Sequence, residues 1–354
     1  MKIAVVGGGI FGITTALKLA ELGHGIDLFE MNGQLLSCAS MVNQFRMHRG
    51  YHYPRSKETA ISAKEGFESF RQFYKQCLLQ DFNHYYCIAK EKSLTSPDRF
   101  ISFCKELGLE YEITEPPEVV KRESISLCVR VKECMLSPSK LLDFCNQSLK
   151  KNKVNIYFRK FRPSDTNRYD IVINATYANQ NYLLQESYPD KMTDYQFEVV
   201  EKLVLKLPVQ FKNLSIVIID GPFTCVDPFD TTGYHLMGNV EVAILSRNIG
   251  RYPNIPPNVK PMLNKGIVPN PMITRFNDFV LAAEEFFYEV EKAEHIGSMF
   301  TVRTVLPHHE HDDARPTEVE KIGDRLVSVF SGKIPTCVSA ADRIIDLISA
   351  KDST

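Results

Sequence analysis

Residues 2–30, KIAVVGGGIFGITTALKLAELGHGIDLFE, decide the fold of this chain. The segment opens with an apolar, β-branched run from Lys2 to Val6, which is typical of a buried parallel strand. Residues 13–22 then repeat apolar side chains at helical spacing, and residues 26–29 form a second short apolar run. The order strand, helix, strand within so few residues predicts the first unit of a parallel α/β sheet.

Three glycines join the first predicted strand to the helix with the spacing G-x-G-x-x-G. Gly7, Gly9 and Gly12 let backbone N–H groups approach an anionic ligand because no Cβ stands in the way. The positive end of the helix dipole favours phosphate at the same place. Glu30, at the end of the second strand, is placed to hydrogen-bond a ribose hydroxyl. Together these features predict a Rossmann-type dinucleotide site.

Composition excludes several classes of protein. The chain has 354 residues, of which 44% are hydrophobic, and this is enough apolar surface for a large core. A net charge of -1 gives none of the basic excess of nucleic-acid-binding proteins, so we expect no nucleic-acid partner. No stretch approaches the roughly 20 apolar residues of a membrane span. The N-terminal apolar run lacks a cleavage site, so we expect it to be structural rather than a signal peptide.

The cysteines indicate a reducing compartment. The nine cysteines are odd in number, form no C-x-x-C pair and are scattered through apolar stretches. This pattern predicts free, mostly buried thiols in a cytoplasmic protein.

Two later segments extend the predicted cofactor site. YDIVINAT at residues 169–176 predicts another buried strand, and residues 325–348 predict a strand, a loop at Ser331–Lys333 and a closing helix. The fingerprint alone fits NAD and FAD alike. The second glycine loop would add N–H donors and one cation, which favours an extended dinucleotide and therefore FAD.

With these segments in order, the chain resembles the FAD-dependent amine oxidoreductases of the D-amino-acid oxidase, glycine oxidase and sarcosine oxidase family. The resemblance also includes residues 135–161, where Ser137 caps a helix with Pro138 in its first turn, and FTVRTVLP at residues 300–307. Family members usually read Ala-Thr-Gly where this chain has Tyr177 in place of the glycine. Either this loop avoids positive φ, or Tyr177 packs beside the cofactor.

The predicted fold class is α/β, with a Rossmann-type FAD-binding domain and an inserted, mainly antiparallel β-sheet substrate domain. We expect the FAD-binding domain to comprise residues 1–80, 136–190 and 300–354, and the substrate domain to comprise residues 81–135 and 191–299. Helices are expected at 57–79, capped by Ser56, at 96–109 and at 276–296. Strands are expected at 83–90, 197–208, 214–222 and 234–245.

FRMHRGYHYPRS, residues 45–56, crowds cationic, imidazole and phenol groups together. Such a cluster could read nucleic acid, hold a metal, line a cofactor site, or brace two domains through buried hydrogen bonds. The resemblance implies that this segment passes the flavin, so we interpret it as a wall of the flavin site. Gly50 would allow a tight turn, and Tyr51 and His52 would face the substrate.

The resemblance implies two sets of site residues. The expected FAD-binding residues are Gly7, Gly9, Ile10, Phe11, Gly12, Glu30, Met31, Ala39, Ser40, Asn43, Gln44, Arg46, Phe161, Ala175, Thr176, Tyr177, Ser331, Gly332, Lys333 and Ile334. The expected catalytic residues are Arg303, His48, Tyr51 and His52. Arg303 matches the family's carboxylate-binding arginine, although a surface strand arginine is the alternative. Lys333 would stabilise the reduced flavin.

The implied function is oxidation of a C–N bond of an amine or amino acid, or of a C–O bond, by hydride transfer to N5 of non-covalent FAD. The small-molecule substrate would bear a carboxylate. A larger, sugar-linked substrate, a non-catalytic FAD-bound scaffold and an NAD-dependent dehydrogenase stay open as alternatives, and the oligomeric state is open. His308, His309 and His311 with Asp312 and Asp313 lack metal-ligand spacing, so we expect no metal site.

Overall fold

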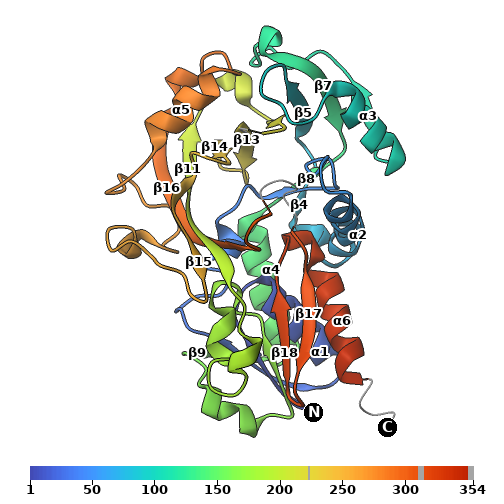
Figure 1. The fold of residues 1–354 in the computed structure, drawn as a ribbon, viewed down its shortest axis with the longest axis vertical. Coiled ribbons are helices and arrows are strands. Elements are labelled where there is room, and N and C mark those ends of the chain that lie inside the picture. Colours follow the sequence, from blue (N-terminus) through green and yellow to red (C-terminus); the bar gives the residue numbers. More distant parts are fainter. Residues whose placement is uncertain (222–223, 310–314, 350–354) are drawn as a thin grey trace.

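A mainly parallel sheet, with one antiparallel edge strand, forms the lower half of the molecule in Figure 1. The computed structural model describes residues 1–221, 224–309 and 315–349. The first sheet has the strand order β17-β18-β10-β1-β2-β9. Its strands are β1 (Lys2–Val6), β2 (Gly25–Glu30), β9 (Asn155–Phe158), β10 (Ile171–Asn174), β17 (Glu318–Ile322) and β18 (Leu326–Phe330).

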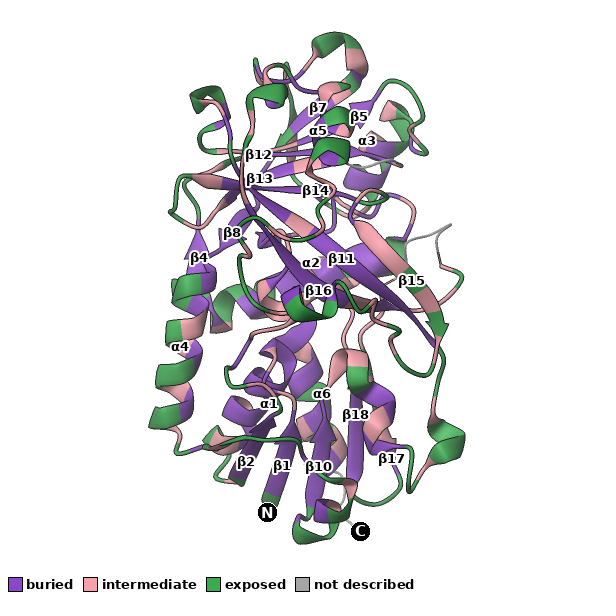
Figure 2. Cartoon of the chain, turned by 90° about the vertical axis from the view of Figure 1, so that its left-hand side faces the viewer, coloured by how far each residue is buried: buried purple, intermediate pink, exposed green. Residues whose placement is uncertain are grey.

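The sequence pattern explains why β1 lies at the centre of this sheet. Val5 lies level with Leu28 on β2 and with Ile173 on β10, in parallel register. Helices α1 (Ile10–Glu21) and α6 (Cys337–Ser349) pack against each other, and their apolar sides share one core with these strands. Figure 2 shows β1, β2, β10 and β18 almost wholly in the buried colour. The predicted Rossmann-type unit is confirmed.

A larger, mainly antiparallel sheet forms the upper half (Figure 1). Its order is β15-β11-β14-β13-β12-β5-β7-β6, with β16 paired to β11, and β5 and β12 are its parallel neighbours. The strands are β5 (Asn83–Ala89), β6 (Tyr111–Ile113), β7 (Ile125–Val131), β11 (Tyr195–Lys206), β12 (Leu214–Ile219), β13 (Thr224–Phe229), β14 (Tyr234–Asn239), β15 (Ile244–Gly250) and β16 (Glu294–Val305). This sheet confirms the predicted fold class.

Shorter elements connect the two sheets. A small sheet has the order β3-β8-β4, from β3 (Arg46–Met47), β4 (Leu78–Leu79) and β8 (Cys134–Leu136). The helices are α2 (Lys57–Phe73), α3 (Pro97–Glu106), α4 (Pro138–Lys151) and α5 (Phe276–Glu284). Ser137 caps α4 as predicted, since its Oγ accepts a hydrogen bond from the Lys140 amide. Ser56 is the cap residue of α2 as expected, but its hydroxyl donates to Thr59 Oγ1 and makes no capping bond to a backbone N–H.

Three expected elements are corrected. The helix expected at 57–79 ends at Phe73, and Leu78–Leu79 form β4. The helix expected at 276–296 ends at Glu284, and the chain turns at Glu289 with a φ of 60° before β16 begins. The long ladder between β16 and β11 outweighs the local helical pattern there. Residues 234–245 form two strands, since Asn239 Oδ1 accepts from the amides of Glu241 and Val242 and makes a turn.

The domain boundaries stay predictions. The strand β16 lies in the second sheet throughout its length, so a boundary at residue 300 would divide it.

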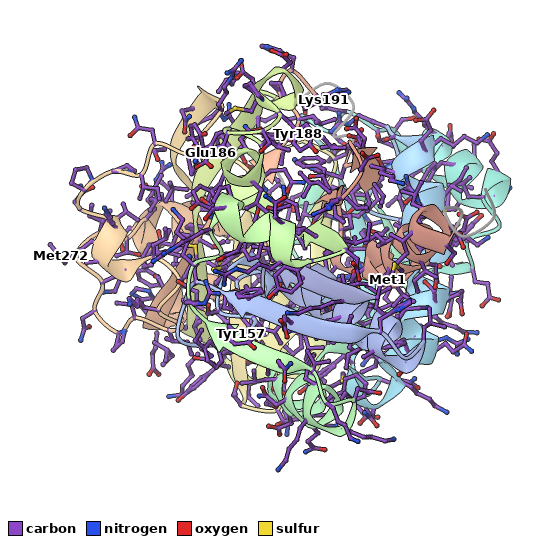
Figure 3. The ribbon with its side chains drawn as sticks, turned by 90° about the horizontal axis from the view of Figure 1, so that it is seen from below. Met1, Tyr157, Glu186, Tyr188, Lys191 and Met272 are labelled. Atoms are coloured by element: carbon purple, nitrogen blue, oxygen red, sulfur yellow. The ribbon has the colours of Figure 1, made fainter. Side chains whose placement is uncertain are left out.

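Figure 3 views the molecule from the end formed by the first sheet. Tyr157 marks the edge strand β9 there, and Met272, which is 76% exposed, projects from the periphery.

The cysteines, the helices and the metal-ligating side chains are each the subject of an expectation. All nine cysteines are free, and Cys38 and Cys225 are half-buried while the others are buried. No helix within the described residues is long and apolar enough to span a membrane. The described part of the chain has no group of three or more His, Cys, Asp or Glu side chains that could hold a metal. His311, Asp312 and Asp313 lie outside the described residues, so the interpretation of that cluster stays a prediction.

Candidate active site

One cavity of about 450 Å³ lies between the carboxyl ends of the first sheet's strands and the second sheet. We call its two parts the glycine half and the sheet half. The glycine half is lined by Val6, Gly7, Gly9, Ile10, Phe11, Phe29, Glu30, Met31, Asn32, Cys38, Ala39, Ser40, Arg159, Lys160, Phe161, Ala175, Thr176, Ser331, Gly332, Lys333 and Ile334. The sheet half is lined by Gln44, Arg46, His48, His52, Val200, Lys202, Val217, Cys225, Asp227, Gly238, Asn239, Val240, Ala243, Thr301 and Arg303.

Glycine backbones build the first part of the glycine half. Gly7 has a φ of 115°, and a Cβ there would overlap the Ala175 carbonyl oxygen. A Cβ on Gly12 would overlap the Gly7 carbonyl, so Gly12 packs behind the cavity instead of lining it. The N-terminus of α1 has Gly9 as its cap residue, and the Ile10 N–H donates to Ser40 Oγ at 3.0 Å. The N–H groups that follow in the first turn suit an anionic group such as a diphosphate.

The acid predicted to bind ribose is held in place by its own loop. Glu30 Oε2 accepts the Gly8 amide at 2.8 Å, and Oε1 accepts the backbone and side-chain nitrogens of Asn32 at 2.8 Å each. Sequence reasoning missed two cations beside it. Arg159 lies over the Phe29 ring at 4.8 Å, and Lys160 also lines the cavity. The basic run RKF directly after β9 was the available signal.

Tyr177 stands where the two halves meet. It has a φ of 53°, so the suggestion that this loop avoids positive φ is wrong. Its hydroxyl accepts from the Thr304 amide at 3.0 Å and donates to the Thr304 carbonyl at 3.1 Å. Burial raises the pKa of this phenol, which stays a donor at neutral pH. Tyr177 lines the cavity, as the other alternative expected.

The floor of the sheet half is a row of small and polar side chains on neighbouring strands. Val217 on β12 lies level with Cys225 on β13, which lies level with Gly238 on β14. A Cβ on Gly238 would lie 2.7 Å from Cys225 Sγ and 2.8 Å from Lys202 Nζ. Gly238 is therefore the position that leaves room for the Lys202 ammonium beside the sheet.

Lys202 is the principal residue that sequence reasoning missed. It has no ion-pair partner among the described residues, and burial lowers its pKa. Because it lies within a regular apolar strand pattern, no local motif distinguishes it from a surface lysine.

Arg303 lies on the cavity wall and has a buried partner. Its Nε donates to Glu198 Oε2 at 2.6 Å across the strand pair β11 and β16. Arg247 reaches the other oxygen at 3.1 Å. Burial raises the pKa of Glu198, but the charge and hydrogen bond of Arg303 outweigh burial, and the pKa lies below its ordinary value. The sequence did not predict this carboxylate beside the expected clamp.

Within residues 45–56, Arg46 both lines the cavity and braces the fold. Its Nε donates to Glu133 at 2.6 Å, its Nη1 donates to Ser215 at 3.0 Å, and its guanidinium lies 4.4 Å from the Tyr86 ring centroid. Its Nη2 is buried without a hydrogen-bond partner among the described residues. Arg46 therefore both lines the expected flavin site and braces the fold through buried hydrogen bonds, so the two interpretations of this segment do not exclude each other.

The side chains of His48 and His52 point to the cavity, whereas that of Tyr51 does not. His48 and His52 line the cavity with their rings stacked at 4.5 Å. Tyr51 is fully buried, and its hydroxyl donates to the Glu110 carbonyl. It does not line the cavity, which corrects the expectation that it faces the substrate. Gly50, with a φ of 111°, makes the expected turn, and a Cβ there would lie 2.8 Å from the Ala60 carbonyl oxygen.

The residues that line the cavity suit a flavin dinucleotide. Every expected FAD-binding residue except Gly12 lines the cavity. On its wall, Gln44 Oε1 is buried without a partner in the described part of the chain. The Lys333 ammonium lies 4.5 Å over the Tyr53 ring, at the rim shared with His48 and His52.

Comparison with known proteins gives a consistent match. Residues 2–239 match the family described as FAD dependent oxidoreductase. The FAD-dependent monooxygenase FPY4 of Fusarium mangiferae is 25% identical over 359 residues, covering 98% of this chain and 91% of that protein. The FAD-dependent monooxygenase kojA of Aspergillus flavus is 27% identical over 252 residues, covering 64% of this chain and 58% of that protein.

Solved structures share the fold at low identity. Glycine oxidase from Geobacillus kaustophilus superposes with a TM-score of 0.72 at 14% identity, over 99% of this chain and 94% of that chain. L-α-glycerophosphate oxidase from Mycoplasma pneumoniae with FAD bound gives a TM-score of 0.73 at 15% identity, over 98% and 94% of the two chains.

Proposed function

Because this chain belongs to the family of FAD-dependent oxidoreductases, we propose that it oxidises a C–N or C–O bond of a small molecule that carries an anionic group. It is an enzyme with FAD as cofactor, and the specific bond and substrate are the proposal. The observation that carries it is one cavity that joins the N-terminus of α1 to the side chains of His48, Lys202 and Arg303.

The chain's own residues divide the work. Gly7, Gly9 and the first turn of α1 would hold the diphosphate, and Glu30 the ribose, while Lys333 would lie near the ring. When bound, FAD accepts two electrons as a hydride. Arg303 and Lys202 would bind and orient the anionic group of the substrate in the sheet half. Such positive charges in a closed cavity favour carboxylate or phosphate over a neutral substrate.

The test is anaerobic reduction of the purified yellow protein. Amines, amino acids, hydroxy acids and sugar acids are each mixed with it, and bleaching of the flavin absorbance is recorded. Bleaching by anionic members of the panel, and not by their uncharged analogues, supports the proposal. Bleaching by none of them, with dithionite still able to reduce the flavin, favours the non-catalytic scaffold. Reduction by a nicotinamide dinucleotide alone would overturn the proposal and favour a monooxygenase.

Non-covalent binding of FAD is part of the same proposal. Acid precipitation should release the flavin into the supernatant. Flavin that stays with the precipitate would show a covalent bond and would direct attention to His48 and Cys225, which line the cavity.

A further inference from the structure

A line of buried hydrogen bonds runs from Glu133 through Tyr86 to His48 on the cavity wall. The Glu133 side chain has no exposed surface and accepts Arg46 Nε at 2.6 Å and the Arg49 amide at 2.8 Å. The Tyr86 hydroxyl, on β5, lies 3.1 and 3.3 Å from the two Glu133 oxygens. The same hydroxyl lies 3.0 Å from His48 Nδ1.

The direction of these hydrogen bonds follows from the number of protons. Glu133, paired with Arg46, is a carboxylate that only accepts, and a tyrosine hydroxyl has a single hydrogen. If Tyr86 donated to His48, its oxygen lone pairs would face the carboxylate at 3.1 Å, which is repulsive. Tyr86 therefore donates to Glu133 and accepts from His48 Nδ1–H. The imidazole is then the tautomer whose Nε2 holds a lone pair.

We propose that Glu133 and Tyr86 are positioning residues that fix His48 with its proton on Nδ1, so that Nε2 accepts a proton from the substrate. This inference rests on the proposed function and narrows its substrate to a compound with a hydroxyl or ammonium group on the carbon that is oxidised. His48 lines the cavity with 19% of its side chain exposed, and Nε2 has no hydrogen-bond partner among the described residues.

The proton transfer completes a balanced oxidation. The substrate C–H bond breaks, and its hydrogen leaves with both electrons to FAD. The O–H or N–H bond breaks, its proton goes to His48 Nε2, and a C=O or C=N double bond forms. The resulting imidazolium returns the proton to water after the product leaves.

The surroundings favour the neutral imidazole. Burial lowers the pKa of His48 most, and the charges of His52, Arg46, Lys333 and His84 lower it further. The other titratable groups that face the ring are Glu133, Tyr86 and Tyr53. Because the base form is the one above the pKa, the reduction rate should be level at neutral pH and fall only at acidic pH, below the ordinary range of histidine.

The first measurement is the tautomer of His48 in the FAD-loaded wild-type protein, by ¹⁵N NMR of labelled histidine with His48→Gln to assign the signal. The expected result is a protonated Nδ1 and an unprotonated Nε2 at neutral pH. A protonated Nε2 would overturn the inference. This readout needs no turnover, so it can fail or succeed independently of the proposed function.

The second measurement is the rate of anaerobic flavin reduction by a substrate from the panel. His48→Gln should lower this rate about 100-fold, in the range of general-base catalysis, and Tyr86→Phe about 10-fold with unchanged FAD content. Tyr86→Phe should also weaken the Nδ1–H signal. The matched control is Tyr51→Phe, since Tyr51 lies against Tyr86 with ring centroids 5.6 Å apart but its hydroxyl bonds elsewhere.

Three outcomes decide the inference. A rate and tautomer unchanged in Tyr86→Phe would overturn it, and so would an equal loss in Tyr51→Phe. If Tyr86→Phe does not fold, Glu133→Gln replaces it, because the amide oxygen still accepts from Tyr86 while the charge is removed. That variant should keep the Nδ1–H tautomer, and a loss of this tautomer in a folded Glu133→Gln protein would contradict the proposed line.

Discussion

The glycine half and the sheet half of the cavity are built by different means. In the glycine half, part of the surface comes from near-consecutive residues at the start of α1, where Gly7, Gly9, Ile10 and Phe11 line the cavity and the two glycines present only backbone. In the sheet half, the surface is made by side chains from separate strands, with Lys202 on β11, Cys225 on β13 and Arg303 on β16.

The difference shows what each half depends on. Backbone N–H groups hold their positions wherever the helix and strand form, so the glycine half requires small residues more than particular side chains. The sheet half requires particular side chains, but each is positioned by the register of a ladder formed between residues far apart in the chain. Mutations in the glycine half should therefore act by adding atoms where there is no room for them. Mutations in the sheet half should act by removing charges and hydrogen bonds.

Gly12→Ala should give the largest effect, because a Cβ there overlaps the Gly7 carbonyl and forces α1 away from β1. We expect loss of bound FAD and a fall of about 3 kcal/mol in the free energy of unfolding, at the upper end for overpacking. Flavin absorbance per protein and denaturant unfolding measure the two effects.

Gly9→Ala is the matched control for this prediction. A Cβ on Gly9 would meet only Ser40 Oγ, at 3.3 Å, so the free energy of unfolding should change by less than about 1 kcal/mol. Equal destabilisation by the two variants would show that the space between α1 and β1 is not what Gly12 protects.

Arg303→Met tests the sheet half next. It should weaken binding of an anionic substrate by about 2–4 kcal/mol, the scale for a charge-assisted pair in a closed site, with FAD content unchanged. KM and the reduction kinetics of the flavin measure this change. Glu198→Gln distinguishes the two explanations of Arg303. If the arginine only braces the strands through Glu198, both variants should weaken substrate binding equally, whereas a substrate clamp should survive Glu198→Gln.

The sequence predicted the glycine half well because its signal is local. Strand, glycines, helix and Glu30 are consecutive, and the expected FAD-binding residues line the cavity apart from Gly12. Lys202, Glu133 and Tyr86 could not be predicted, since each lies in an ordinary strand pattern and meets its neighbours only through long-range pairing. Tyr51 was misplaced for a related reason, as side chains one residue apart in a turn can point into the cavity or into the core. The helix expected at 276–296 failed because the β11–β16 ladder outweighs local periodicity.

Lys202→Met should have a smaller effect, and its size depends on pH. Because the folded-state pKa of Lys202 is lowered, the unfolded chain binds more protons between that pKa and the ordinary value, so wild-type stability rises with pH there. At pH 7 the variant should be about 1–2 kcal/mol more stable, since a desolvated charge is removed. This difference in the free energy of unfolding between the variant and the wild type should narrow as the pH rises toward the ordinary lysine pKa.

Thermal unfolding across this pH range measures the gap between wild type and Lys202→Met. The control is Lys206→Met on the same strand, whose ammonium is exposed and pairs with Glu294 at 2.8 Å. It should produce no comparable gap at any pH. A gap that stays constant up to alkaline pH would mean that folding does not lower the pKa of Lys202.

Tyr177 stands where both halves meet, and its replacement by glycine should give the smallest effect because two contributions partly cancel. Tyr177→Gly relieves a left-handed backbone worth about 1 kcal/mol but loses two hydrogen bonds to Thr304 worth about 0.5–1.5 kcal/mol each. Tyr177→Phe loses the same hydrogen bonds and keeps the strain, so it should be the less stable variant by denaturant unfolding. If the glycine variant is the less stable of the two, contact of the aromatic ring with its neighbours outweighs backbone strain. In that case a particular side chain, as in the sheet half, also governs the loop in which Tyr177 replaces the family's glycine.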